Sequence, residues 1–355
     1  MTGHPTGIGR PALDSVDYRK SPLLVIWEAT RSCALACAHC RAAAELGRDP
    51  RELTTDEGKV LLDDVAGMGT PIFIISGGDP FNRPDLEELI KHGKQRGLRM
   101  GTIPAATEKL TEERMLSVKE AGVDQVAFSI DAPEAGPHDE FRGVPGAYDR
   151  TIKGIEIAHR LNIPVQINTC FGEWNLDRLE EMIEFVKKSN IVFWEVFFLI
   201  PTGRGSKMKP ITAGQFEGVF KRLEEVRKEV DFHVKLTEAQ HLFRYKAEEA
   251  GKELPSPAVN AGKGFAFVDF KGDAYPSGFL PLSAGSVRKR PLSEIYRDSP
   301  LFKDLRDPDR LGGKCGRCEY AWTCGGSRAR AFAMTGDPLG PDPSCSYVPK
   351  GKTVA

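Results

Sequence analysis

Six short stretches rich in β-branched and aromatic residues recur along the first two thirds of the chain. They cover residues 23–27, 71–75, 99–103, 125–130, 164–169 and 194–200. Amphipathic helical patterns lie between them, for example at 55–68, 85–96 and 176–188. Six strand-helix units in series predict a parallel sheet with right-handed crossovers, which is either doubly wound or curled into a partial barrel.

Residues that can carry chemistry follow the ends of these predicted strands. Cys33, Cys37 and Cys40 come after the first strand; Gly77, Gly78 and Asp79 come after the second; Ser129 and Asp131 end the fourth, and Asn168 ends the fifth. In both architectures ligands bind at the carboxyl ends of the strands. We therefore expect these separate loops to meet at one edge of the sheet.

The loop after the first strand holds three cysteines, Cys33, Cys37 and Cys40, separated by three and two residues. Thiolates select iron-sulfur clusters or zinc over metals that prefer oxygen. A cubane of four irons takes four thiolates, so three would leave one iron open to another ligand. A zinc site completed by His39, or three buried thiols without metal, is also compatible with this spacing.

Four further cysteines lie near the C-terminus, Cys315, Cys318, Cys324 and Cys345, with two, five and twenty residues between them. Four thiolates satisfy one cluster completely, and a structural zinc site uses similar spacings. The spacing alone leaves both open. The remaining cysteine, Cys170, is expected to be an inert small core residue.

Charge and hydropathy exclude several classes of partner. Lys plus Arg (49) nearly balances Asp plus Glu (50), so there is no electrostatic case for nucleic acid or for an anionic membrane. The most apolar segment, 191–200, is too short to span a bilayer, and the start lacks the features of a secretory signal. We expect a cytoplasmic protein whose clustered cysteines bind metal and do not form disulfides.

The three-cysteine loop behind a hydrophobic strand resembles the signature of the radical S-adenosylmethionine (SAM) superfamily. Gly77-Gly78-Asp79-Pro80 resembles the family's Gly-Gly-Glu-Pro motif, with Asp79 where glutamate is usual. The resemblance implies that Cys33, Cys37 and Cys40 hold a 4Fe-4S cluster whose open iron binds SAM. It also implies that the backbone of the Gly-Gly-Asp segment holds the SAM amine. Reductive cleavage of SAM would then give a 5′-deoxyadenosyl radical that abstracts hydrogen from a substrate.

Other candidate SAM contacts follow from the residues and from this resemblance. Ser129 and Asp131 alternate onto one side of a strand, where they can hydrogen-bond ribose hydroxyls or simply cap the strand end. By resemblance to the loop after this strand in the family, Arg142 is the candidate for the SAM carboxylate, which a guanidinium fork suits. For Asn168 a SAM contact and a plain strand-end role are both open.

The C-terminal cysteines and the residues around them resemble the SPASM extension, which carries auxiliary 4Fe-4S clusters. The resemblance implies an α/β fold, a partial (β/α)6 TIM-like barrel followed by a small cysteine-rich SPASM/twitch-like domain. On this basis residues 1–20 are an N-terminal tail, 21–230 the radical SAM barrel, 231–260 a bridging segment and 261–355 the SPASM-like domain. A β-hairpin is predicted at 264–270 and 273–276, around the turn Lys271-Gly272.

Two positions depart from relatives that have two auxiliary clusters, because Ser277 and Ser327 stand where those relatives tend to have cysteine. The remaining cysteines ligate one auxiliary cluster, so we expect two clusters per chain. The closest likeness is to enzymes of the alternative haem pathway, which implies a tetrapyrrole substrate and an electron donor such as flavodoxin or ferredoxin. A ribosomally made peptide is the alternative substrate, and an iron-sulfur sensor without enzymatic activity is the alternative class.

Overall fold

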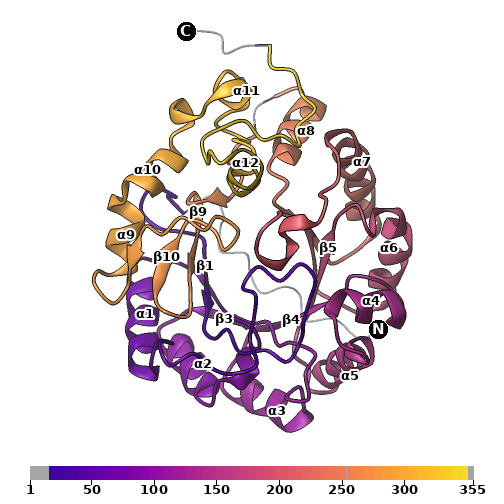
Figure 1. Ribbon diagram of the computed structural model, residues 1–355, viewed down its shortest axis with the longest axis vertical. Coiled ribbons are helices and arrows are strands. Elements are labelled where there is room, and N and C mark those ends of the chain that lie inside the picture. The colour runs from indigo at the N-terminus through magenta and orange to yellow at the C-terminus, as the bar shows by residue number, and fades with distance from the viewer. Residues whose placement is uncertain (1–15, 253, 351–355) are drawn as a thin grey trace.

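The computed structural model describes residues 16–252 and 254–350. Seven parallel strands form the main sheet, each next to its predecessor in sequence. They are β1 (Leu24–Glu28), β2 (Ile72–Ser76), β3 (Arg99–Thr102), β4 (Gln125–Ser129), β5 (Val165–Phe171), β6 (Phe193–Phe198) and β7 (His233–Thr237). Figure 1 shows these strands curling inside an outer arc of helices. The predicted partial barrel is confirmed, and it has one more parallel strand than the six expected.

The helices that cover the outer face begin and end at recognisable residues. They are α1 (Thr55–Gly67), α2 (Leu86–Gln95), α3 (Glu112–Glu120), α4 (Ala135–Arg142), α5 (Ala147–Arg160), α6 (Leu179–Lys188), α7 (Ala213–Glu229) and α8 (His241–Ala250). Capping boxes start α1 at Thr54 with Glu57 and α7 at Thr212 with Gln215. Their apolar faces bury one continuous core with the outward side chains of the strands, including Trp27, Phe128 and Trp194.

The seventh strand lies in the segment that the sequence marks only as a bridge. Residues 231–260 contain β7 and α8, and β7 pairs with β6 from Phe193–His233 to Phe197–Thr237. Only Val234 and Leu236 give β7 an alternating apolar pattern, and three of its five residues are half-buried. This segment therefore continues the barrel before the chain reaches the cysteine-rich region.

The predicted hairpin is present and extends the same sheet on its other side. Strand β9 (Gly264–Val268) pairs in parallel with β1 and antiparallel with β10 (Asp273–Tyr275). Gly272 provides the left-handed backbone conformation of the turn, with φ of 88°. Short strands β8 (Asn260–Ala261) and β11 (Gly285–Ser286) flank the pair, followed by α9 (Leu292–Asp298), α10 (Pro300–Arg306), α11 (Gly313–Gly316) and α12 (Arg328–Thr335). The cysteine-rich region is thus anchored directly beside the first strand of the barrel.

The inner face of the sheet is polar along its β4–β7 half. Ser129, Asn168, Glu195 and Lys235 lie in register across four neighbouring strands. Side chains alternate along a strand, so this row lies on the face opposite the core residues. Among the described helices, none combines the length and the apolar character that crossing a bilayer requires.

Candidate functional site

The loop with the first three cysteines leaves the carboxyl end of β1 and is held by backbone hydrogen bonds. The N–H groups of Ala36 and Ala38 donate to the carbonyls of Arg142 and Phe141, at 3.1 and 2.8 Å. Cys33 and Cys37 are buried and Cys40 is half-buried. The end of α4 therefore fixes the path of the loop between its cysteines.

Gly77 and Gly78 are required by the close approach of two loops. A Cβ atom at Gly77 would lie 2.6 Å from the carbonyl oxygen of Thr30, and one at Gly78 would lie 2.5 Å from that of Ser32. The N–H of Gly78 donates to Thr30 O and that of Asp79 to Ser32 O, both at 2.7 Å. The loop after β2 is thus packed on the start of the cysteine loop, and its predicted role toward the SAM amine stays a prediction.

The carboxylate of Asp79 is fully buried and joins the loops after β2 and β3. It accepts hydrogen bonds from the hydroxyl of Thr107 at 2.6 Å and from the N–H groups of Phe81 and Ala105 at 3.1 and 3.3 Å. Burial raises the pKa of this carboxyl although these bonds lower it. The side chain at this motif position organises the edge of the sheet where the predicted site residues lie.

Asp131 and Arg142, which the sequence predicts as separate SAM contacts, form a buried ion pair with each other. The second carboxylate oxygen of Asp131 accepts from the N–H of Cys170 at 2.9 Å. Burial opposes ionisation of Asp131, but the charge of Arg142, the nearby histidines and the hydrogen bond from Cys170 together hold the pKa of the carboxyl below its usual range. The other Nη of Arg142 lies 3.7 Å from the sulfur of Cys37. The pair therefore sits directly against the three-cysteine loop.

Ser129 and Asn168 are neighbours on β4 and β5, in register and on one face. Asn168 Oδ1 accepts from Gln166 Nε2 at 2.6 Å, and the same nitrogen donates to Glu195 at 2.9 Å. Glu195 in turn accepts from Lys235 Nζ at 2.7 Å. The structure thus brings both predicted residues into a polar row on the inner face that the sequence did not single out.

A second inner-face ion pair lies beside the cysteine loop. Arg41, the residue after Cys40, pairs with Glu28 at the end of β1, and its guanidinium lies 4.5 Å from the ring centre of Phe267 on β9. Burial lowers the pKa of Arg41 to about 10. The one sequence signal for this pair is Glu28, an acidic residue directly after the predicted strand 23–27. The pair connects the first cysteine loop to the C-terminal hairpin.

His39, the alternative fourth ligand of a zinc site, belongs to a stack of aromatic rings. Its ring lies 4.4 Å from that of Phe141, which in turn lies 4.0 Å from that of Trp174. Burial, with the nearby charge of Arg142, lowers the pKa of His39 to about 4. The stack covers one side of the cysteine loop.

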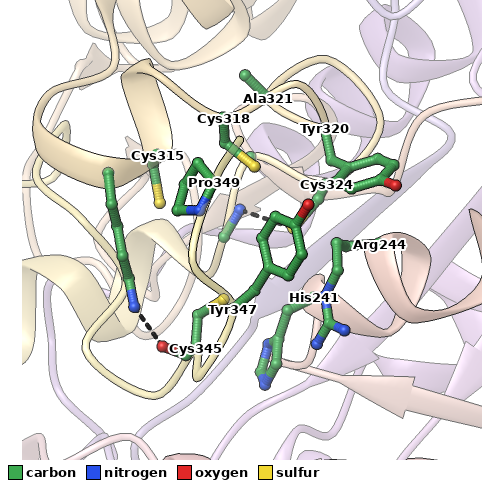
Figure 2. A pocket seen from close by; sticks show the side chains of 13 residues that line it. His241, Arg244, Cys315, Cys318, Tyr320, Ala321, Cys324, Cys345, Tyr347 and Pro349 are labelled. Carbon is green, nitrogen blue, oxygen red and sulfur yellow. Dashed lines mark hydrogen bonds between the residues drawn. The ribbon is translucent and has the colours of Figure 1, made fainter. Parts of the chain in front are cut away.

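The four C-terminal cysteines come together around one cavity. Figure 2 shows Cys315, Cys318, Cys324 and Cys345 around it, with His241 and Arg244 from α8 on one side. The space between these residues that atoms do not fill, part of it open to solvent, is about 370 Å³. The four cysteines therefore line one cavity, and their role as ligands of one cluster stays a prediction.

Backbone and guanidinium N–H groups point at the sulfurs of this site. Cys315 Sγ accepts from the N–H of Asp342 at 3.4 Å and from Arg328 Nη2 at 3.6 Å, and Cys324 Sγ accepts from the N–H of Gly326 at 3.3 Å. A Cβ atom at Gly326 would lie 3.3 Å from Cys315 Sγ, and its φ of 63° is left-handed. Such donors favour thiolates, which are the form that binds a cluster.

Neither cysteine group is arranged around a position for a single ion in the part of the chain that the structure describes. A zinc ion needs its ligand atoms at about 2.3 Å from one point. Within the described parts of the chain, no three His, Cys, Asp or Glu side chains converge on a position for one ion. In a cubane each thiolate takes a different iron, so the sulfurs surround the cluster without converging. Burial raises the pKa of Cys33 to about 12 and of Cys318 to about 11, so the charge of a bound metal would be needed to ionise them.

Ser277 and Ser327, which offer no thiolate, have local structural roles. Ser327 caps α12 by accepting from the N–H of Arg330 at 3.0 Å, and its hydroxyl donates to the buried carboxyl of Glu238 at 2.5 Å. Ser277 Oγ accepts from the N–H of Phe279 at 3.2 Å. Both side chains are buried and engaged within the fold.

Comparison with known proteins agrees with this site. The family model of the radical SAM superfamily matches residues 27–186. A Methanosarcina barkeri protein named AdoMet-dependent heme synthase is 41% identical over 344 residues, which cover 94% of this chain and 98% of that protein. A Nitratidesulfovibrio vulgaris protein of the same name is 38% identical over 367 residues, which cover 99% of each.

Among solved structures, Streptococcus suis SuiB bound to S-adenosylmethionine aligns with a TM-score of 0.74. The alignment covers 92% of this chain and 78% of that one, at 16% identity, and it confirms the fold. The sensor alternative is wrong, because the whole-length relatives are enzymes named for their use of SAM. This chain belongs to the radical SAM superfamily, whose members are enzymes that bind SAM at a 4Fe-4S cluster.

Proposed function

We propose that this enzyme oxidatively decarboxylates the propionate side chains of an iron coproporphyrin. The observation that carries the proposal is the similarity along almost the whole chain to two proteins named heme synthase, at 41% and 38% identity. The similarity includes both cysteine regions, so it extends well beyond the SAM-binding barrel.

The reaction balances as follows. Loss of one hydrogen atom, of CO₂ and of one electron converts a propionate carboxylate into a vinyl group. When bound, the N-terminal cluster and SAM supply the 5′-deoxyadenosyl radical that takes the hydrogen atom. The electron leaves to a one-electron acceptor, and a low-potential donor such as flavodoxin or ferredoxin supplies the electron for SAM cleavage. We place the enzyme in the cytoplasm, where such donors work.

The N-terminal residues would hold the cofactor as the resemblance implies. Cys33, Cys37 and Cys40 each take one iron and leave the fourth iron to SAM. The edge that faces the SAM amine would be formed by Gly77, Gly78 and Asp79. The Asp79 carboxylate would keep its hydrogen bond to Thr107 and would not contact SAM. Ser129 and Asn168 supply polar groups on the same face.

Asp131 and Arg142 would act together. Because Asp131 occupies one Nη of Arg142, the guanidinium is fixed in orientation before SAM arrives. Arg142 would present its remaining N–H groups to the SAM carboxylate, and Asp131 would hold it there. The contribution of Asp131 to SAM binding would thus be indirect, and the ribose contact would fall mainly to Ser129.

The inner face offers groups for a substrate with several carboxylates. Lys235 is half-exposed and its ammonium is balanced by Glu195 at 2.7 Å. Arg41 provides a second cation on the same inner face, at the end of β1 beside the cysteine loop. Two paired cations on one concave face are suited to hold propionates while water is kept from the radical.

The C-terminal site would hold one auxiliary 4Fe-4S cluster, with Cys315, Cys318, Cys324 and Cys345 as its ligands. Support comes from the cavity that these four residues line and from the N–H groups directed at Cys315 and Cys324. Ser277 and Ser327 provide no further thiolates. The chain would therefore carry two clusters, with about eight irons in total.

The test is anaerobic turnover of the reconstituted enzyme with SAM, reductant and iron coproporphyrin III. We expect 5′-deoxyadenosine together with products that have lost one or two units of CO₂ plus hydrogen, followed by mass spectrometry. A Soret band that does not respond to the protein would contradict the tetrapyrrole proposal. If SAM is cleaved but the tetrapyrrole is unchanged, a ribosomally made peptide becomes the favoured substrate class.

A further inference from the structure

Arg328, the first residue of α12, is buried beside the C-terminal cysteines with a relative exposure of 1%. Its Nη1 donates to the carbonyls of Pro338 and Gly340 at 3.1 and 2.6 Å, and its Nε donates to the carbonyl of Gly326 at 3.2 Å. Its Nη2 donates to Cys315 Sγ at 3.6 Å. The guanidinium is therefore held in one orientation by three carbonyls and directed at one sulfur.

This buried cation lacks a carboxylate partner. In residues 16–252 and 254–350, no Asp or Glu oxygen lies within 4.0 Å of the Arg328 guanidinium. Asp342, which lies next to Gly326, is instead paired with Arg330 at 3.0 Å and accepts from the N–H groups of Ser327 and Ser344. A buried charge without a partner costs several kcal/mol. The remaining contact of the Arg328 guanidinium is with the sulfur of Cys315.

The other cations near the cavity differ from Arg328. Arg244 pairs with Glu217 and Glu248, so carboxylates neutralise its charge. Lys314 donates to the carbonyl of Cys345 and lies on the rim. Lys263 donates to the carbonyl of Trp322. Among these cations, Arg328 is the one whose guanidinium donates to a cysteine sulfur.

We propose that Arg328 is a positioning residue for the auxiliary cluster, which it stabilises in the reduced form and whose reduction potential it raises. The inference depends on a cluster in the C-terminal site but not on the identity of the substrate. The step concerned is the gain of one electron by the cluster from an external reductant, with no bond broken and no proton moved. Reduction adds a negative charge next to a fixed, buried cation, which favours the reduced state.

The local sequence explains why this arginine can reach the sulfur. Gly325 and Gly326 both have left-handed backbone conformations, with φ of 69° and 63°, and they turn the chain sharply after Cys324. A Cβ atom at Gly326 would lie 2.7 Å from Arg328 Nη2 and 3.3 Å from Cys315 Sγ. The glycine therefore leaves the space in which guanidinium and sulfur meet.

The experiment uses a full-length chain in which Cys33, Cys37 and Cys40 are replaced by alanine, so that only the auxiliary cluster is present. Its reduction potential is measured by redox titration with detection of the reduced cluster by electron paramagnetic resonance (EPR). In this background Arg328→Gln removes the charge but keeps donors, and Arg328→Lys keeps the charge. We expect Arg328→Gln to disfavour reduction at least tenfold, which is about 59 mV for one electron, and Arg328→Lys to retain most of the potential.

Iron and sulfide analysis of each variant comes first. About four irons in the parent variant establish the cluster, whereas zinc or no iron would remove the basis of the inference. An unchanged potential in fully loaded Arg328→Gln would overturn it. If Arg328→Gln does not bind a cluster, the parent variant labelled with ¹⁵N-arginine provides the test. We expect nitrogen coupling to the reduced cluster, and its absence would overturn the proposal.

Discussion

The two cysteine groups of this chain are built differently around the same kind of ligand. The N-terminal group has three thiols, and the arginine beside it, Arg142, is neutralised by Asp131. The C-terminal group has four thiols, and the arginine beside it, Arg328, is held by carbonyls in place of a carboxylate. Each arginine donates to one cysteine sulfur, at 3.7 Å for Cys37 and 3.6 Å for Cys315.

This difference fits the two tasks that we propose. A site that must admit SAM at an open iron keeps its arginine in a neutral pair, ready to contact the ligand carboxylate. A closed site with four thiolates needs no exchangeable partner, and its fixed cation serves the cluster itself. The partner of the arginine thus differs between the two sites: a carboxylate where we propose that SAM binds, and carbonyls where we propose that an electron is carried.

The largest effect is expected for the N-terminal thiols. Cys37→Ala removes one of only three thiolates, so it should abolish formation of 5′-deoxyadenosine and lower the iron content by about four per chain. Cys170→Ala is the control, since that cysteine is outside both groups, and it should leave both quantities unchanged. Retention of SAM cleavage in Cys37→Ala would contradict the assignment of the catalytic cluster.

Loss of a C-terminal thiol should separate the two sites. Cys318→Ala is expected to lower iron from about eight to about four per chain while SAM cleavage without substrate continues. The physical reason is that each cysteine group builds its own site. Iron analysis and quantification of 5′-deoxyadenosine check this. If Cys318→Ala lost SAM cleavage together with the auxiliary iron, the two sites would not be independent.

Removing the carboxylate of Asp131 should leave Arg142 without a carboxylate partner, as Arg328 is in the C-terminal site. Asp131→Asn leaves a buried cation without a partner, which costs about 3–5 kcal/mol of stability. In loaded protein the reduction potential of the N-terminal cluster should rise, and that of the auxiliary cluster should stay constant. EPR-monitored redox titration measures both, and a lowered N-terminal potential would contradict our account of the pair.

The smallest effect concerns the packing of the two N-terminal loops. Gly78→Ala places a Cβ atom 2.5 Å from a backbone oxygen, so we expect a loss of about 1–3 kcal/mol and weaker loading of the N-terminal cluster. Gly47→Ala is the matched control. Gly47 lies in the loop after β1, and no atom lies within 4 Å of its Cβ position. Chemical denaturation and iron analysis compare the two, and equal behaviour would refute the packing argument.

The sequence predicted the barrel well because its first six strands are apolar, regularly spaced and separated by clear helical patterns. It missed β7 because only Val234 and Leu236 mark that strand among polar residues, and the strand is stabilised by pairing with β6. The hairpin was predictable from the turn at Lys271-Gly272. Its parallel pairing with β1 had no local signal, because partners such as Trp27 and Val268 are 241 residues apart in the chain.

The candidate site shows the same limit at the level of side chains. The cysteines and the strand ends carry their own signal, since spacing and polarity are visible in the chain. The pairing of Asp131 with Arg142 depends on how α4 folds back, and the burial of Arg328 depends on the turn at Gly325 and Gly326. Charged residues are mostly exposed, so sequence alone gives no reason to expect a buried guanidinium.

The most direct test of the central claim is electron-nuclear double resonance (ENDOR) spectroscopy of the reduced N-terminal cluster, in full-length protein whose four C-terminal cysteines are replaced by alanine. SAM with ¹⁵N in its amino group and ¹⁷O in its carboxylate is the probe. Our account predicts coupling of both nuclei to the cluster, because one iron is free for SAM. A spectrum that shows neither coupling at saturating SAM would contradict it.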